Sequence, residues 1–134
     1  MPLAPGITSD LTYIVEEKDT AFQFGGDGYP HVLSTPRLIS LMEVASANAV
    51  AAELPKEQTT VGLAVDMQHL AATPVGMEIR VHSELLEIDG RRLRYKVEAW
   101  DRMEKIGECI HDRFIIDWER FCKRVNEKKQ AISS

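Results

Sequence analysis

The sequence predicts an α+β fold, with a curled antiparallel sheet wrapped around one long buried helix, from two observations. Between Arg37 and Glu53 every residue is uncharged except Glu43, and a helix that is apolar on nearly all sides is a buried helix. After this segment the pattern changes to the period-two alternation of strands with one solvated face. Because a flat sheet cannot cover a helix on every side, we expect the sheet to curl about the helix.

The long helix is predicted from about Arg37 to Leu54. Thr35 is a good N-cap, and Pro36 suits the first helical position because an N–H at that position has no helical partner. The helix is expected to stop before Pro55. Small side chains along it allow a sheet to approach closely, and they are Ala45, Ala47, Ala49, Ala51 and Ala52.

The clearest strands follow the helix and are predicted to form a hairpin. Met77–Leu85 and Arg92–Ala99 both alternate apolar residues with polar or charged ones, so each strand has one face toward a core. The Asp89–Gly90 pair between them is typical of a tight turn. Weaker patterns predict a short strand at 11–16, strands at 61–70 and 105–117, and a short amphipathic C-terminal helix carrying Trp118, Phe121, Cys122 and Val125.

Length and composition narrow the class of protein. The 134 residues fit a single domain over 1–134, with 44% apolar and 28% charged residues and a net charge of −5, which leaves no basic footprint for nucleic acid. Val44–Ala52, the longest uncharged apolar stretch, is too short to span a membrane. With no signal peptide at the start, and with Cys109 and Cys122 matching no metal or disulfide pattern, we expect a cytoplasmic protein without metal or cofactor.

Three residues are candidates for chemistry, and each has a structural alternative. Glu43 is a carboxylate within an apolar helix, where a charge is costly unless it is paired; it belongs either to a reaction site or to the helix's one wet edge. His69 ends a predicted strand and is either a general base or a satisfied structural residue. The cap role explains Thr35 completely, yet its hydroxyl proton would remain free for donation to a base.

Other polar residues give weaker indications. His111 and Arg113 are two apart on a predicted strand and share one face, which either places a guanidinium beside a substrate or lines a solvated face. Cys109 with His111 is a weak metal pattern. The glycine-rich segment 25–28 is not a phosphate loop, because it lacks the Lys and Ser/Thr of that motif; it is either an ordinary turn or a mobile loop over a site.

Four short motifs occur in order along the chain. They are Thr35 with Glu43 eight residues later in Leu41-Met42-Glu43, the run His69-Leu70-Ala71-Ala72-Thr73-Pro74-Val75-Gly76, the run Gly90-Arg91-Arg92-Leu93, and Ile106-Gly107 followed by His111-Asp112-Arg113. Together they resemble the fluoroacetyl-CoA thioesterase family of the hotdog-fold superfamily. The resemblance extends from about Pro30 to Phe121 and implies the hotdog form of the α+β fold.

The resemblance also implies a site. In that family a threonine, a glutamate and a histidine form the catalytic set, and they match Thr35, Glu43 and His69. A glycine that helps to bind the carbonyl group matches Gly62, and the arginine of the His-x-Arg segment matches Arg113. The family's lid aromatic, a phenylalanine, is matched by Tyr29. A homodimer is implied as well, with the strand near 61–70 pairing across the two-fold axis and the active sites at the interface.

The sequence therefore predicts hydrolysis of a small acyl-CoA thioester, with Thr35 or a water molecule as nucleophile. A non-catalytic acyl-CoA binding or sensing domain is the alternative, because one fold supports many functions; a dehydratase of the same fold fits the motifs less well. Helix geometry adds a constraint. Thr35 and Glu43 are separated by about 12 Å along one helix, so either His69 bridges them, or Thr35 lies on a loop that folds back, or a partner protomer supplies one of the residues.

Overall fold

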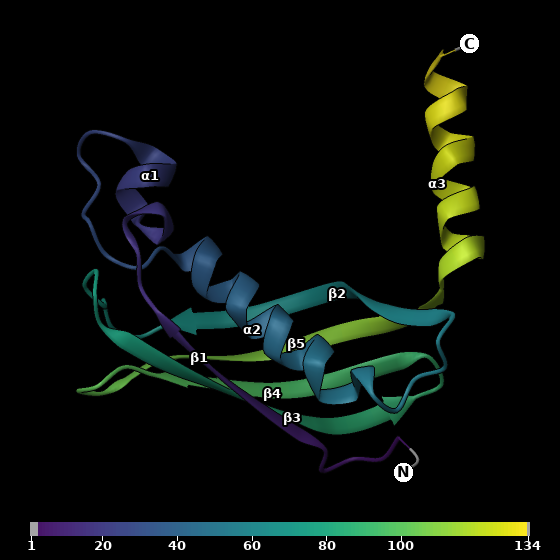
Figure 1. The fold of residues 1–134 in the computed structure, drawn as a ribbon, viewed down its shortest axis with the longest axis horizontal. Coiled ribbons are helices and arrows are strands. Elements are labelled where there is room, and N and C mark those ends of the chain that lie inside the picture. Colours follow the sequence, from purple (N-terminus) through teal and green to yellow (C-terminus); the bar gives the residue numbers. More distant parts are fainter. Residues whose placement is uncertain (1–2, 134) are drawn as a thin grey trace.

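The computed structural model describes residues 3–133 and places five strands and one long helix in a single layered unit (Figure 1). The elements in chain order are β1 (Thr8–Ile14), a 3-10 turn η1 (Glu17–Asp19), α1 (Ala21–Gly25), α2 (Thr35–Ala51), β2 (Gln58–His69), β3 (Glu78–Asp89), β4 (Arg92–Trp100), β5 (Lys105–Asp117) and α3 (Trp118–Ser133). No helix among the described residues is long and apolar enough to cross a membrane.

The sheet confirms the predicted architecture. Its strand order is β1-β3-β4-β5-β2, every neighbouring pair is antiparallel, and α2 lies across its concave face (Figure 1). The hairpin turn is where the Asp89–Gly90 pair predicts it, with Asp89 opposite Arg92 and Gly90 at φ +61°. Because β2 stands at the edge, the backbone groups on its outer side have no strand beside them among residues 3–133.

The core lies between α2 and the inward faces of β3 and β4. Leu38, Met42 and Ala45 of the helix are buried, and so are the alternating inward residues of both strands: Ile79, Val81, Ser83, Leu85, Leu93, Tyr95, Val97 and Ala99. Ser46 of α2 bonds across to Ser83 at 2.9 Å, which satisfies two hydroxyl groups inside the core. The period-two pattern therefore identifies the face of each strand correctly.

The start of α2 differs from the prediction, because Ser34 rather than Thr35 is the N-cap. The Ser34 side chain accepts a hydrogen bond from Arg37 N at 3.2 Å, with Ser34 in extended backbone geometry. The amide that a Thr35 cap would need belongs to Leu38, and it donates instead to Ser34 O at 3.0 Å. Thr35 is thus already helical, with Pro36 one position further in than predicted.

The expectation that α2 is buried on all sides is also wrong for the single chain. Val44 is 46% exposed, and the side chain of Glu43 beside it is 42% exposed. The helix contacts β1, β2, β3 and β4 across the concave face of the sheet (Figure 1). The side of α2 that carries Glu43 and Val44 nevertheless remains partly open to solvent.

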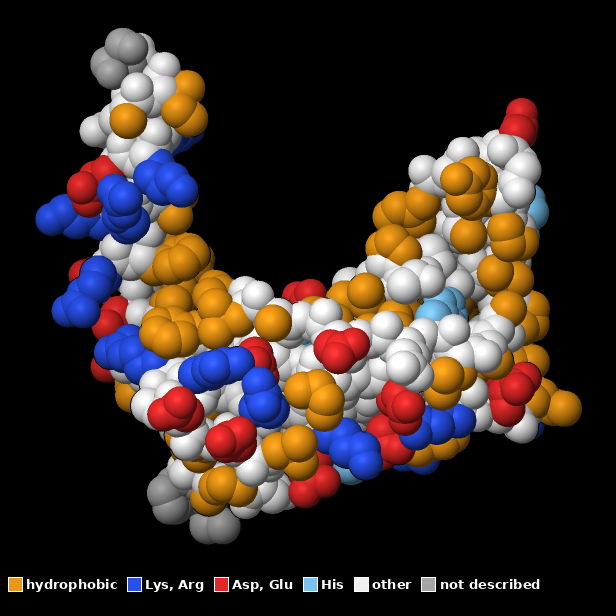
Figure 2. Space-filling view, turned by 180° about the vertical axis from the view of Figure 1, so that it is seen from behind, with side chains coloured by type: hydrophobic (Ala, Val, Ile, Leu, Met, Phe, Trp, Pro, Cys, Tyr) orange, Lys and Arg blue, Asp and Glu red, His pale blue; other side chains and the backbone are white. Residues whose placement is uncertain are grey.

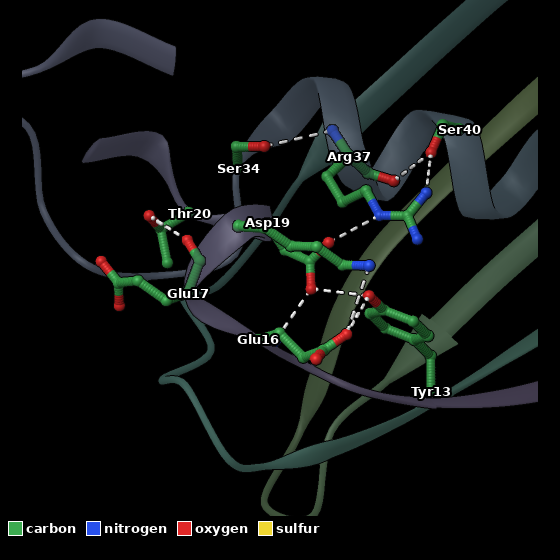
Figure 3. Close-up of polar contacts among 9 residues, drawn as sticks. Tyr13, Glu16, Glu17, Asp19, Thr20, Ser34, Arg37 and Ser40 are labelled. Atoms are coloured by element: carbon green, nitrogen blue, oxygen red, sulfur yellow. Dashed lines mark hydrogen bonds and ion pairs between the residues drawn. The ribbon is translucent and has the colours of Figure 1, made fainter. Parts of the chain in front are cut away.

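The chain between β1 and α2 forms a protrusion that the sequence does not predict. We call residues 16–31, which contain η1, α1 and a glycine-rich loop, the N-terminal arm. Asp19 ties the arm to the first turn of α2 (Figure 3): its buried carboxylate accepts hydrogen bonds from Tyr13 Oη, Glu16 N and Arg37 Nε, each at 2.8 Å. Burial opposes ionisation, but these hydrogen bonds together hold the pKa of Asp19 below its usual range.

The two ends of β2 carry different structures. The segment that joins the N-terminal arm to α2 is fixed at the His69 end, because Leu33 N donates to Thr73 O at 2.9 Å. At the other end α3 begins, where Trp118 N donates to Glu57 O at 2.9 Å. This helix has 16 residues, longer than the short helix predicted, and projects away from the sheet (Figure 1).

Candidate active site

Thr35 and His69 form a hydrogen-bonded pair. Thr35 comes from the first turn of α2 and His69 from the last position of β2, and 2.8 Å separates Thr35 Oγ1 from His69 Nδ1. Because Ser34 caps the helix, the Thr35 hydroxyl is not engaged in capping and can donate to the imidazole. The prediction that His69 lies close to Thr35 or Glu43 is confirmed for Thr35.

The environment of His69 favours its neutral form. The ring is half-buried, and this burial lowers the pKa of His69, an effect that the backbone of Ala71 partly offsets. A neutral imidazole can accept a proton, whereas an imidazolium cannot. A hydroxyl and a neutral imidazole within hydrogen-bonding distance are the arrangement that general-base activation of a nucleophile requires.

Glu43, Gly62 and Arg113 meet in a second cluster. The Glu43 carboxylate lies 3.7 Å from Arg113 Nη1. A methyl group added at Gly62 would lie 3.6 Å from Glu43 Oε2 and 3.7 Å from Arg113 Nη1, so the backbone of Gly62 borders the same space. The register of β2 against β5 shifts between Gly62 and Ala64, and such a bulge removes backbone groups from the ladder. Glu43 has the polar partner predicted for it, but it is half-exposed rather than largely buried.

Arg113 is held in place from three sides. It is buried, and it donates from Nε to Thr60 Oγ1 at 2.8 Å and from Nη2 to Thr60 O at 2.9 Å. Its Nη1 lies 3.2 Å from His111 Nε2. Since an arginine can only donate, His111 Nε2 accepts, and the proton of the ring is on Nδ1, which donates to Ala64 O at 2.8 Å.

His111 is therefore a fully buried, neutral ring that fixes one edge of the guanidinium. Burial lowers the pKa of His111, the backbone of Ala64 opposes this, and the charge of Arg113 adds to the lowering. His111 and Arg113 therefore do not line a solvated face: their side chains point inward, toward α2 and Glu43. The sequence does not show which face of this strand is buried, because Asp112, between His111 and Arg113, is buried too. Asp112 lies on the opposite face of the sheet and accepts hydrogen bonds from Arg92 and Arg94.

The two clusters stay apart within one chain. Thr35 and Glu43 lie eight residues apart on the same helix, which corresponds to about 12 Å. His69 bonds to Thr35 at one end of β2, while Glu43 faces Gly62 and Arg113 nearer the other end. Two of the three ways in which Thr35 and Glu43 could share a site are thereby removed within one chain: Thr35 is in the helix rather than on a loop, and His69 bonds to Thr35 and not to Glu43.

Tyr29 lies on the N-terminal arm and is 55% exposed. Its ring packs on the backbone of Gly25, where an added methyl group would come within 2.5 Å of the ring, so this contact requires glycine. Gly26 and Gly28 adopt positive φ angles of 78° and 94°. The glycine-rich segment is thus a folded turn that presents an aromatic side chain to solvent.

Cysteine and metal chemistry are not indicated at this site. Cys109 is buried, and burial raises the pKa of its thiol to about 12, with Glu43 and Asp66 adding to the shift. A thiol with this pKa stays protonated near neutral pH and is neither a nucleophile nor a ready metal ligand. Among the described residues no group of three or more His, Cys, Asp and Glu side chains is arranged to hold a metal ion.

Known proteins share both the sequence and the fold of this chain. The family model for fluoroacetyl-CoA-specific thioesterases matches residues 15–119. The fluoroacetyl-CoA thioesterase of Streptantibioticus cattleyicolor is 37% identical over 103 residues, which are 77% of this chain and 74% of that protein. A solved structure of the fluoroacetyl-CoA thioesterase FlK superposes with a TM-score of 0.91 at 30% identity and covers 96% of this chain and 98% of its own.

A solved structure of lower sequence identity has the same fold. A thioesterase superfamily member from Thermus thermophilus superposes with a TM-score of 0.86 at 25% identity, over 97% of this chain and 98% of that one. The sequence match, the family model and the superposed structures agree with one another. The chain therefore belongs to the fluoroacetyl-CoA-specific thioesterase family and is a thioesterase with the hotdog fold.

Proposed function

We propose that this protein hydrolyses a small acyl-CoA thioester to the free acid and CoA, with Thr35 as nucleophile and His69 as general base. The observation that carries the proposal is the 2.8 Å contact between Thr35 Oγ1 and His69 Nδ1, made by a hydroxyl that has no capping role. A domain that only binds or senses acyl-CoA has no need for a hydroxyl held against a neutral imidazole. Relatives named for fluoroacetyl-CoA support a short acyl group.

The proposed reaction has two steps. In the first, the Thr35 proton passes to His69 Nδ1, Thr35 Oγ1 bonds to the thioester carbon, and the carbon–sulfur bond breaks; the CoA thiolate takes the proton from His69 and leaves. In the second, water loses a proton to His69 and attacks the Thr35 ester, and Thr35 Oγ1 regains the proton as the acid departs. A backbone N–H near Gly62 and the Arg113 guanidinium are suited to stabilise the oxyanion in both steps.

The proposal requires two copies of the chain, because Thr35 with His69 and Glu43 with Gly62 and Arg113 are separate clusters. Antiparallel pairing of two β2 edges would join them. If Gly62 stands opposite the partner's His69, the bulge between Gly62 and Ala64 sets Asp66 opposite the partner's Asp66, and the strand pairs symmetrically with itself. Leu63 and Val65, which are 54% and 38% exposed on this edge, support the pairing, since it would cover both.

In the joined site each cluster has its own task. Thr35 and His69 of one subunit supply the nucleophile and base, and the carbonyl binds between Gly62 and Arg113 of the other. The Glu43 carboxylate then lies near the imidazole and stabilises its charged form during transfer of the proton. Tyr29 closes the acyl end of the site from the N-terminal arm.

A panel of acyl-CoA thioesters, followed by the release of free thiol, tests the proposal. We expect turnover of short acyl groups, and we expect His69→Ala to lose it by about two to four orders of magnitude. His82→Ala is the matched control, because His82 lies on the outer face of the sheet beside Asp10 and should leave the rate unchanged. If the wild-type protein binds acyl-CoA but releases no thiol from any member of the panel, the binding or sensing alternative is correct instead.

A further inference from the structure

Helix α3 has an apolar side that none of the residues 3–133 buries. Trp118, Phe121 and Val125 are 59%, 38% and 48% exposed, Cys122 lies among them at helical spacing, and none of the described residues of α3 is buried. A single helix of this length is marginally stable in water, and most helices in proteins depend on the packing of one apolar face. The apolar side of α3 therefore requires a partner surface.

A second unpartnered apolar surface stands across from it. Figure 2 shows a hollow between α3 and the N-terminal arm, with hydrophobic side chains on both sides of the hollow. On the arm side, Phe24 and Tyr29 are 62% and 55% exposed, and Leu70 and Val75 at the base of the arm are 49% and 43% exposed. The two surfaces rise from opposite ends of β2, so within one chain they cannot meet.

The two-fold axis proposed above brings these surfaces together. In an antiparallel pairing of two β2 edges, the Gln58 end of one strand lies beside the His69 end of the other. Gln58 pairs with Asp117, directly before α3, and Thr73 O, just beyond His69, accepts from Leu33 N, two residues after the N-terminal arm. We propose that α3 of each subunit packs its apolar side (Trp118, Phe121, Cys122 and Val125) against the N-terminal arm of the second copy, and so forms the outer wall of that copy's acyl-CoA site. This inference rests on the proposed homodimer.

The charges of the two surfaces are complementary. Helix α3 carries five cations and two anions, a net charge of +3, whereas the N-terminal arm carries four carboxylates and one lysine, a net charge of −3. Packing of α3 against the α3 of a second copy would bring two cationic helices together, and like charges across an interface oppose association. Charge and apolar surface thus both favour the arm as the occupant of the α3 face.

The contact gives α3 a role in substrate binding. The arm carries Tyr29, and the contacts from Tyr13, Leu33 and Arg37 hold the arm near Asp19 and Thr20, at its base. A helix from the second copy would brace the arm from outside and fix the position of Tyr29 over the acyl group. We therefore expect disruption of the α3 face to raise the KM for acyl-CoA while Thr35 and His69 remain in place.

A disulfide between subunits tests the contact, because Cys122 already lies on the apolar side of α3. Phe24→Cys, Tyr29→Cys and Val75→Cys are made singly, oxidised mildly and analysed on non-reducing gels. At least one should give a covalent dimer that disappears when Cys122→Ser is added. Met103→Cys is the control: Met103 is 79% exposed on the β4–β5 turn and should not crosslink.

Activity provides a second readout with matched charge changes. Val125→Asp introduces one negative charge on the apolar side of α3, and Lys123→Gln removes one positive charge from the polar side. Val125→Asp should raise KM roughly tenfold, equivalent to about 1.4 kcal/mol, and Lys123→Gln should leave it unchanged.

A dimer of normal activity without any Cys122 crosslink would overturn the inference and leave the proposed function standing. A protein that is monomeric, or that uses α3 to bind vesicles of anionic phospholipid, would overturn it as well.

Discussion

The hydroxyl of Thr35 lies 2.8 Å from Nδ1 of His69, and it is available because the preceding residue, Ser34, caps the helix. Two adjacent hydroxyl residues thus have separate tasks at the start of α2. Ser34 satisfies a backbone amide, and Thr35 faces the end of β2. This separation makes the structural and the chemical contributions of the two residues measurable one at a time.

Loss of the cap should affect stability rather than chemistry. We expect Ser34→Ala to lower the free energy of unfolding by about 1 kcal/mol, and Thr35→Ser, which leaves the cap intact, to lower it by much less. Urea denaturation of both variants measures this. A larger loss for Thr35→Ser than for Ser34→Ala would mean that Thr35 is the true cap.

The rate should depend on the protonation of His69. Protonation removes the base, so kcat/KM should fall as pH decreases through the pKa of His69. Burial lowers this pKa within one chain, whereas Glu43 beside the ring in the proposed dimer would raise it. Glu43→Gln should therefore move the midpoint of the acidic limb of the pH–rate profile to lower pH, and a midpoint that stays the same would contradict the placement of Glu43 beside the imidazole.

His111 should act on the reaction through Arg113. His111→Gln keeps an oxygen that can accept from Arg113 Nη1, whereas His111→Leu fills a similar space without an acceptor. We expect His111→Leu to lower kcat/KM by at least roughly tenfold, since a buried donor left unpaired costs about 1–3 kcal/mol, and His111→Gln to recover part of the loss. Equal activity of the two variants at equal stability would show that the hydrogen bond to Arg113 has no effect on the reaction.

Asp19 should stabilise the attachment of the arm in a pH-dependent way. Asp19→Asn removes the charge that accepts from Arg37 and Tyr13, and we expect a loss of about 1.5–3 kcal/mol at neutral pH. Because the folded-state pKa of Asp19 is depressed, the wild-type advantage is fully present above the unfolded value near 3.8 and is lost as pH falls through the folded value. Urea denaturation at several pH values measures the difference, and Asp89→Asn on the exposed hairpin is the control. A difference that stays constant below pH 4 would rule out this origin.

The sequence predicts the regular part of the fold well. Alternation over β3 and β4 identifies the buried faces, β5 has the predicted bounds, and the Asp89–Gly90 turn is correct, because each of these features depends on local chemistry. The cap is ambiguous from sequence alone, since serine and threonine both suit the position, and the geometry of Leu38 N decides between them. The N-terminal arm is short and depends on the tertiary contact between Asp19 and Arg37, which no local pattern reveals.

The candidate site is predictable in its members and not in its arrangement. Resemblance to a family identifies Thr35, Glu43 and His69, but only the structure pairs the first with the third and sets Glu43 beside Arg113. The apolar composition of α2 predicts burial on all sides, and Val44 is nevertheless exposed. A single sequence does not distinguish burial within its own chain from burial against a second copy.

The turnover of Thr35→Asn tests the proposed mechanism most directly. Asparagine keeps a polar side chain at the first helical position and leaves the Ser34 cap in place, yet it supplies no hydroxyl for His69 to activate. With a short-chain acyl-CoA and thiol release as the readout, the variant should fold normally and lose most of its turnover, while Thr35→Ser keeps much of it. If folded Thr35→Asn releases thiol at a rate near that of the wild type, Thr35 is not the nucleophile, and water activated by Glu43 and His69 must carry the reaction.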